Sequence, residues 1–107
     1  MWDDDKPFSV LARSQDRVVG ALIGKIFFNW LDAELVWIER PFRRSGIGQA
    51  VLRKAEEKAR GLNLTGIYLW SQSWQAPDFY RKLGFEQLAE FGNFPPGHKR
   101  LGFRKYL

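Results

Sequence analysis

Alternation of hydrophobic and polar residues over the first third of the chain is typical of β-strands. Residues 8–13 alternate, and the β-branched and aromatic run at 17–29 follows a polar break. We expect these two segments to form a hairpin, with a turn near residues 31–33 leading to a third antiparallel strand at 34–39. Pro41 cannot donate a sheet hydrogen bond, so the strand should end before it.

The hydrophobic spacing then changes to three and four residues, which predicts an amphipathic helix over residues 46–60. Its apolar positions are Ile47, Val51, Leu52, Ala55 and Ala59. Gly61 follows as a stop signal, and the continuous apolar run within 65–71 is typical of a strand buried on both faces. Strand, helix and strand in this order predict a parallel crossover.

The last third predicts a short helix at 75–83 and two closing strands at 85–91 and 99–107. Pro77 suits the first turn of that helix, Gly84 suits its end, and glycines and prolines separate the strands. The predicted fold class is therefore mixed α/β, in one domain over residues 1–107. Its order is three antiparallel strands, a crossover helix, a buried strand, a short helix and two strands.

The amino-acid composition excludes several classes of functional site. The 107 residues include 45% hydrophobic side chains and no cysteine, which argues against disorder and excludes disulfides, thiolate nucleophiles and cysteine-bound metals. The apolar stretch at 18–31 is interrupted by glycine, lysine and asparagine, and the acidic start does not resemble a secretory signal. We expect a cytoplasmic protein with no membrane or metal partner.

Positive charge is concentrated after residue 42. Residues 1–42 hold 5 basic and 7 acidic side chains, whereas residues 43–107 hold 12 basic and 5 acidic ones. A polyanion is a reasonable partner, either nucleic acid or a phosphorylated small molecule.

A candidate phosphate-binding loop lies where the third strand gives way to the first helix. It consists of Arg43, Arg44, Ser45, Gly46, Ile47 and Gly48. Glycines there allow close backbone approach to an anion, and the free amides of a first helical turn favour negative charge. No Walker lysine follows, and Val51 breaks the dinucleotide pattern GxGxxG, so neither ATP nor NAD is favoured.

A second motif, A-x-x-F-Y-x-K-x-G-F at residues 76–85, follows about thirty residues later. Together the two motifs resemble the GNAT superfamily of acyl-CoA-dependent N-acyltransferases. The resemblance covers roughly residues 8–107. It implies that the loop binds the pyrophosphate of acetyl-CoA and that Tyr80 lies beside the thioester sulfur. An amine acceptor would attack directly, with Tyr80 protonating the departing thiolate.

The same resemblance implies further site residues. Backbone groups of Trp37 and Ile38 would bind the pantetheine arm, in a cleft between strands 34–39 and 65–71. Phe79 and Tyr80 would line the far end of the cleft, with Ser73 close by.

A general base must come from elsewhere. Asp32 and Glu34 have the same strand parity as Val36 and Ile38, so we expect them on one face, where either could accept a proton directly or through water.

Two departures from the family pattern carry expectations. Arg44 stands where the family often has glycine, which is tolerable if its φ is negative. Residues 1–7 stand where the family usually has a strand and one or two helices, so a homodimer could complete the fold. Two other functions remain open: a small basic nucleic-acid-binding module, which we favour less because no signature supports it, and a catalytically silent CoA-binding partner.

Overall fold

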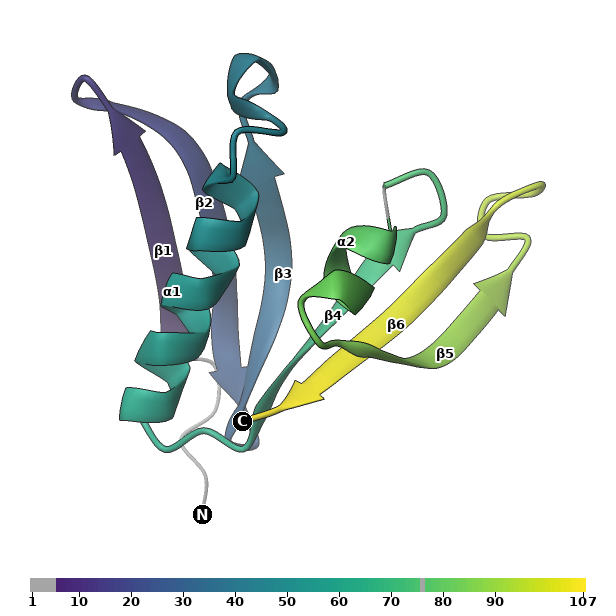
Figure 1. Ribbon diagram of the computed structural model, residues 1–107. Coiled ribbons are helices and arrows are strands. Elements are labelled where there is room, and N and C mark those ends of the chain that lie inside the picture. The colour runs from purple at the N-terminus through teal and green to yellow at the C-terminus, as the bar shows by residue number, and fades with distance from the viewer. Residues whose placement is uncertain (1–5, 76) are drawn as a thin grey trace.

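A six-stranded mixed sheet forms the body of the protein in the computed structural model, which describes residues 6–75 and 77–107 (Figure 1). The strand order is β1-β2-β3-β4-β6-β5. The strands are β1 (Lys6–Ser14), β2 (Arg17–Phe27), β3 (Trp30–Ile38), β4 (Gly66–Gln72), β5 (Glu86–Gly92) and β6 (Lys99–Tyr106). The pairing is antiparallel except between β3 and β4, which confirms the predicted mixed α/β fold and the parallel crossover.

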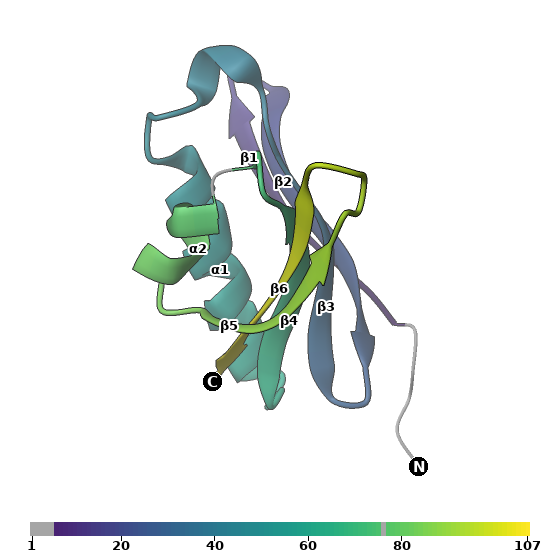
Figure 2. The same cartoon turned by 90° about the vertical axis from the view of Figure 1, so that its right-hand side faces the viewer.

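Both α-helices, α1 (Ile47–Gly61) and α2 (Pro77–Lys82), lie on the same face of the sheet, as Figure 2 shows. The apolar stripe of α1 is buried as predicted at Val51, Leu52, Ala55 and Ala59. It packs against a core in which the largest fully buried side chains include Phe103, Leu22, Leu31 and Ile67. Burial of this stripe, rather than helix propensity alone, holds α1 on the sheet. Neither helix of the described residues is both long and apolar enough to cross a membrane.

The turn between β2 and β3 lies earlier than the sequence pattern predicts. Phe27 pairs with Trp30, so Phe28 and Asn29 form a two-residue turn with φ values of 48° and 65°. Two consecutive positive φ angles are what a tight hairpin turn needs. The Asn29 side chain also donates hydrogen bonds to the Asn63 carbonyl (3.2 Å) and to Thr65 Oγ1 (3.1 Å). The prediction of a turn at residues 31–33 was therefore wrong, and Leu31 is a core residue.

A β-bulge in the middle of β3 changes which side chains share a face. Ile23 pairs with Leu35 and Gly24 pairs with Ala33, which leaves Glu34 without a partner on β2. The extra residue reverses the alternation: Leu31 and Ala33 are buried before it, whereas the more protected residues after it are Val36 and Ile38. The expectation that Asp32 and Glu34 share a face with Val36 and Ile38 was wrong for this reason.

Strands β3 and β4 are paired over only three residues before they separate. The register joins Trp30 to Gly66, Leu31 to Ile67 and Asp32 to Tyr68. Beyond Asp32 the edge of β3 has no strand partner on the β4 side among the described residues. This opening divides the sheet into two halves, with α1 over β1 to β3 and α2 over the other half (Figure 1).

Candidate active site

The loop before α1 is held by contacts from its own side chains. A short 3-10 helix at Arg40–Phe42 follows β3, and Ser45 Oγ donates a hydrogen bond to the carbonyl of Phe42. Arg43 Nε donates back to the Ile38 carbonyl at 3.1 Å, which ties the loop to the end of β3. Glu39, the acid beside this loop, pairs with Arg17 at 2.8 Å. The neighbourhood of the loop therefore stays positive.

Arg44 adopts a left-handed backbone conformation with a φ of 65°. The condition under which an arginine would be tolerated here without strain, a negative φ, is therefore not met. Only glycine enters this region without a steric penalty, because the Cβ of other residues approaches the backbone. This explains in physical terms why glycine would suit this position. Gly46, two residues later, also has a positive φ, of 87°, and is the N-cap of α1.

The first turn of α1 presents free backbone donors. Ala50 N–H bonds to the Gly46 carbonyl at 3.0 Å and is the first amide of the helix to do so, so Ile47, Gly48 and Gln49 have no helical acceptor. No side chain of the described residues caps them. A Cβ at Gly46 would meet no atom within 4 Å, so the approach to these amides is open on that side. Free amides, the helix dipole and nearby arginines together fit a diphosphate.

Gly48 has a different purpose from Gly46, because it allows α2 to approach α1. A Cβ at Gly48 would lie 3.2 Å from Cζ of Phe79. The Phe79 ring is therefore placed against the start of α1, and it is not among the residues that line the cavity described next. Ser73 is also outside that cavity: its N–H and Oγ bond to the backbone of Lys99 at 2.8 and 3.1 Å. Ala76 of the second motif lies outside the described residues.

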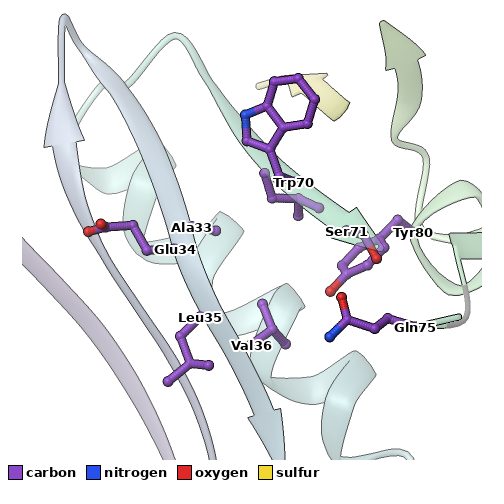
Figure 3. Close-up of a pocket in the computed structure, with 9 residues that line it drawn as sticks. Ala33, Glu34, Leu35, Val36, Trp70, Ser71, Gln75 and Tyr80 are labelled. Atoms are coloured by element: carbon purple, nitrogen blue, oxygen red, sulfur yellow. The ribbon is translucent and has the colours of Figure 1, made fainter. Parts of the chain in front are cut away.

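A cavity of ≈ 170 Å³ occupies the opening between β3 and β4. Its walls are residues 33–36 of β3, residues 69–71 of β4, Gln75 and Tyr80 (Figure 3). At about 30 Å³ for each water-sized group, it holds roughly five or six such groups, enough for the acetyl end of a thioester and an incoming amine nitrogen. The cavity therefore lies where the resemblance places the cleft.

Tyr80 is the ionisable side chain of α2 that reaches the cavity. Its ring packs among Phe79, Phe85 and Phe103, with ring centroids 5.2, 5.9 and 5.7 Å away. Burial raises the pKa of Tyr80 above its ordinary value, so the hydroxyl keeps its proton at neutral pH. Figure 3 shows this hydroxyl directed toward the side-chain amide of Gln75. The arrangement presents a protonated acid at the inner wall of the cavity.

The two candidate bases have different surroundings. Glu34 lines the cavity, although Figure 3 shows its carboxylate directed away from Tyr80. Asp32 does not line the cavity and lies at the last pair before β3 and β4 separate. Burial raises the pKa of Asp32, its hydrogen bond with Tyr68 lowers it and the nearby Glu34 charge raises it, with a net upward shift. Of the two, Glu34 alone lines the cavity.

Trp37 and Ile38 lie on the open edge of β3, beyond its pairing with β4. An extended ligand could hydrogen-bond to this edge as an added strand does. The Ile38 carbonyl already accepts the bond from Arg43, so part of the edge serves to hold the loop.

Sequence reasoning did not select several residues that line the cavity, notably Ser71, Gln75 and Leu35. Gln75 is held by two bonds to Gln72: its Oε1 accepts from the Gln72 N–H, and its own N–H donates to the Gln72 carbonyl, both at 2.9 Å. Leu35 lies directly after the unpaired Glu34, so its face could not be predicted from the alternation along β3. A polar residue three positions after the buried strand was the available signal for Gln75.

Known proteins with similar sequences identify the family. Residues 1–85 match the Acetyltransferase (GNAT) family, so the chain belongs to that family, as the two motifs indicated. It is 31% identical over 81 residues to the blasticidin-S acetyltransferase of Streptomyces morookaense, covering 75% of this chain and 60% of that protein. The chain thus spans about three fifths of the length of that relative.

Solved structures agree with this fold. The chain superposes on an acetyltransferase from Bacillus cereus with a TM-score of 0.91 and 28% identity, covering 95% of this chain and 74% of that one. A Bacillus anthracis protein assigned as a streptothricin acetyltransferase, in complex with acetyl coenzyme A, gives a TM-score of 0.85 and covers 98% and 65% of the two chains. At 19% identity, this second likeness shows the fold alone.

Among the described residues, no group of three histidine, cysteine or acidic side chains is placed to hold a metal ion.

Proposed function

We propose that this chain transfers an acetyl group from acetyl-CoA to a primary amine by direct attack in a ternary complex. The observation that carries the proposal is one geometry: uncapped amides open α1 beside the separated strands, and a protonated tyrosine lies at the inner wall of the cavity between them. Membership of the acetyltransferase (GNAT) family supports it.

The residues divide the work as follows. The loop of Arg43, Arg44, Ser45, Gly46, Ile47 and Gly48 binds the pyrophosphate, and the open edge of β3 at Trp37 and Ile38 orients the pantetheine arm. Acetyl-CoA supplies an activated thioester. As the amine nitrogen forms its bond to the carbonyl carbon and the C–S bond breaks, Tyr80 donates its proton to the sulfur. Glu34, or Asp32, accepts one proton of the ammonium group directly or through water, and the second proton that the nitrogen loses on becoming an amide restores the Tyr80 hydroxyl.

The lack of cysteine makes the transfer assay direct. Because the chain has no thiol, a thiol reagent reports only the CoA released from acetyl-CoA in the presence of an amine. We expect amine-dependent release and also a higher melting temperature when CoA is added, since a ligand of the native state stabilises it. A CoA-dependent shift without release for any of a broad panel of amines would instead support the silent-partner alternative.

Substitution at Gly46 tests the diphosphate site with a matched control. Gly46→Asp places a carboxylate beside the free amides, whereas Gly46→Ala imposes the same backbone strain at a φ of 87° without a charge. Both side chains enter open space. We expect the aspartate to weaken CoA binding at least tenfold relative to the alanine. Equal dissociation constants for the two variants would contradict the proposed site.

A further inference from the structure

An aromatic and arginine stack lies next to the cavity, on the strands β4 to β5. It consists of Trp70, Arg100, Phe94 and Phe91. The Arg100 guanidinium carbon lies 5.3 Å from the Trp70 ring centroid and 5.7 Å from that of Phe94, and the Phe91 and Phe94 centroids are 4.6 Å apart. The three rings are 43–55% exposed. A cation held between two accessible rings is well ordered and still reachable by a ligand.

The sheet determines what lies beneath this stack and on which face the stack lies. A Cβ at Gly102 would meet the Trp70 ring at 3.2 Å, so the indole lies over that glycine. Because strand residues alternate between faces, Trp70 is on the face opposite to buried Leu69 and Ser71, which is the face without helices. Trp70 itself lines the cavity, so the stack starts at the cavity wall and runs away from it.

Within the described part of the chain, the charge of Arg100 is not neutralised by an ion pair. Among residues 6–75 and 77–107 no carboxylate lies within ion-pair distance of its guanidinium. Glu90, on the facing strand, pairs with Lys99 at 3.4 Å. Arg104 offers a contrast on the same strand and face: its guanidinium also lies over a ring, 5.3 Å from Tyr106, but its Nε bonds to Glu86 at 2.8 Å.

We propose that Arg100 binds an anionic oxygen group, a carboxylate or a phosphate, carried by the amine acceptor. This inference rests on the proposed function, because it assumes that the amine enters the cavity. With the amine there, the rest of the acceptor extends over Trp70 toward Arg100. The planar guanidinium can donate two parallel hydrogen bonds to such a group, and Trp70 offers a flat apolar surface to the segment between. Arg100 is therefore a specificity-determining residue, not a catalytic one.

Three primary amines with the same five-carbon spacing, long enough to cross the Trp70 ring, test this assignment: 6-aminohexanoate, 6-aminohexanamide and 5-aminopentyl phosphate. We expect kcat/KM for at least one of the anionic amines to exceed that for the amide about tenfold or more. The Arg100→Gln variant should lose this preference. The matched variant Arg104→Gln should keep it, and both variants should bind CoA as the wild type does. Arg100→Lys retains the positive charge but cannot donate two parallel hydrogen bonds. Its preference for the anionic amines should therefore be intermediate.

The outcomes separate this inference from the proposed function. The relative rates of the carboxylate and phosphate arms identify which anion is preferred. Equal kcat/KM for all three amines, or equal effects of the Arg100 and Arg104 substitutions, would overturn the assignment and leave acetyl transfer intact. If no acetyl group is transferred, calorimetric titration with the same compounds still tests Arg100. Anion binding that depends on Arg100 would then support the anion site and refute only the proposed function. If the anionic amines bind no better than the amide and no acetyl group is transferred, both fail.

Discussion

Replacing Arg44 by glycine should make the protein more stable and lower its affinity for CoA. The backbone at Arg44 has a φ of 65°, which costs a residue with a Cβ about 1–2 kcal/mol relative to glycine. Glycine loses part of this advantage, about 0.5–1 kcal/mol, because its unfolded chain is more flexible. The net gain is about 0.5–1 kcal/mol, which corresponds to about 2–8 °C in melting temperature for a domain near 100 residues.

The loss of the arginine charge acts in the opposite direction on ligand binding. A single positive charge about 7 Å from a phosphate contributes about 0.6 kcal/mol in a medium like water. Loss of this attraction to the two phosphates, about 1.2 kcal/mol in all, should therefore raise the dissociation constant of CoA up to about eightfold at low salt and about two- to threefold at physiological salt.

Arg44→Ala separates the two effects. It removes the same charge but keeps a Cβ at a positive φ, so its melting temperature should match that of the wild type while its CoA affinity falls as in the glycine variant. Thermal melting followed by circular dichroism and calorimetric titration at two salt concentrations measure both quantities. If the glycine variant melts no higher than the alanine variant, the argument from backbone strain is refuted.

Three further predictions concern single side chains. Tyr80→Phe should lower kcat by a factor of about 10² or more with little change in the CoA dissociation constant; unchanged kcat would remove Tyr80 as the acid. Burial and the nearby Asp32 raise the pKa of Tyr68 to about 12 from 10.0. Protonated Tyr68 therefore contributes fully to the free energy of unfolding below pH 10, and this contribution is lost as the pH rises toward 12. In urea unfolding, the free energy of unfolding of Tyr68→Phe should therefore fall less between those pH values than that of the wild type. An identical fall in both proteins would contradict this. Lys105→Met should destabilise the fold by about 1.5–3 kcal/mol, because buried Glu56 loses a charged hydrogen bond of 2.8 Å and keeps only the ion pair with Arg60 at 3.6 Å. The double substitution with Glu56→Leu should restore much of that loss. Equal urea midpoints for the single and the double variant would argue against this.

The elements with a clear hydrophobic period could be predicted from sequence, and the irregularities could not. The spacing of Val51, Leu52, Ala55 and Ala59 placed α1 within a residue of its observed bounds. The turn at Phe28 and Asn29 was missed because neither residue is glycine, the usual signal for a positive φ. Its one available cue was asparagine, which tolerates that conformation better than most residues.

The site shows the same division. The loop from Arg43 to Gly48 could be proposed from sequence because its glycines stand between a strand and a helix, although in the structure Gly48 also allows Phe79 to approach α1. The bulge at Glu34 could not be predicted, because a bulge is defined by the pairing of one strand with another. The sequence of β3 alone does not show where its pairing with β2 gains an extra residue. It is this bulge that puts Val36 on the same face as buried Ala33 and separates Asp32 and Glu34 from that face. A parity argument along one strand cannot anticipate it.

The proposed function depends above all on binding of the CoA diphosphate by the free amides at the start of α1. Titration of ¹⁵N-labelled protein with CoA, followed by amide NMR, tests it at the atoms concerned. We expect saturable shifts that are largest at the N–H groups of Ile47, Gly48 and Gln49, with small changes at the opposite end of the helix near Gly61. Saturable binding that leaves those three amides unshifted would contradict it.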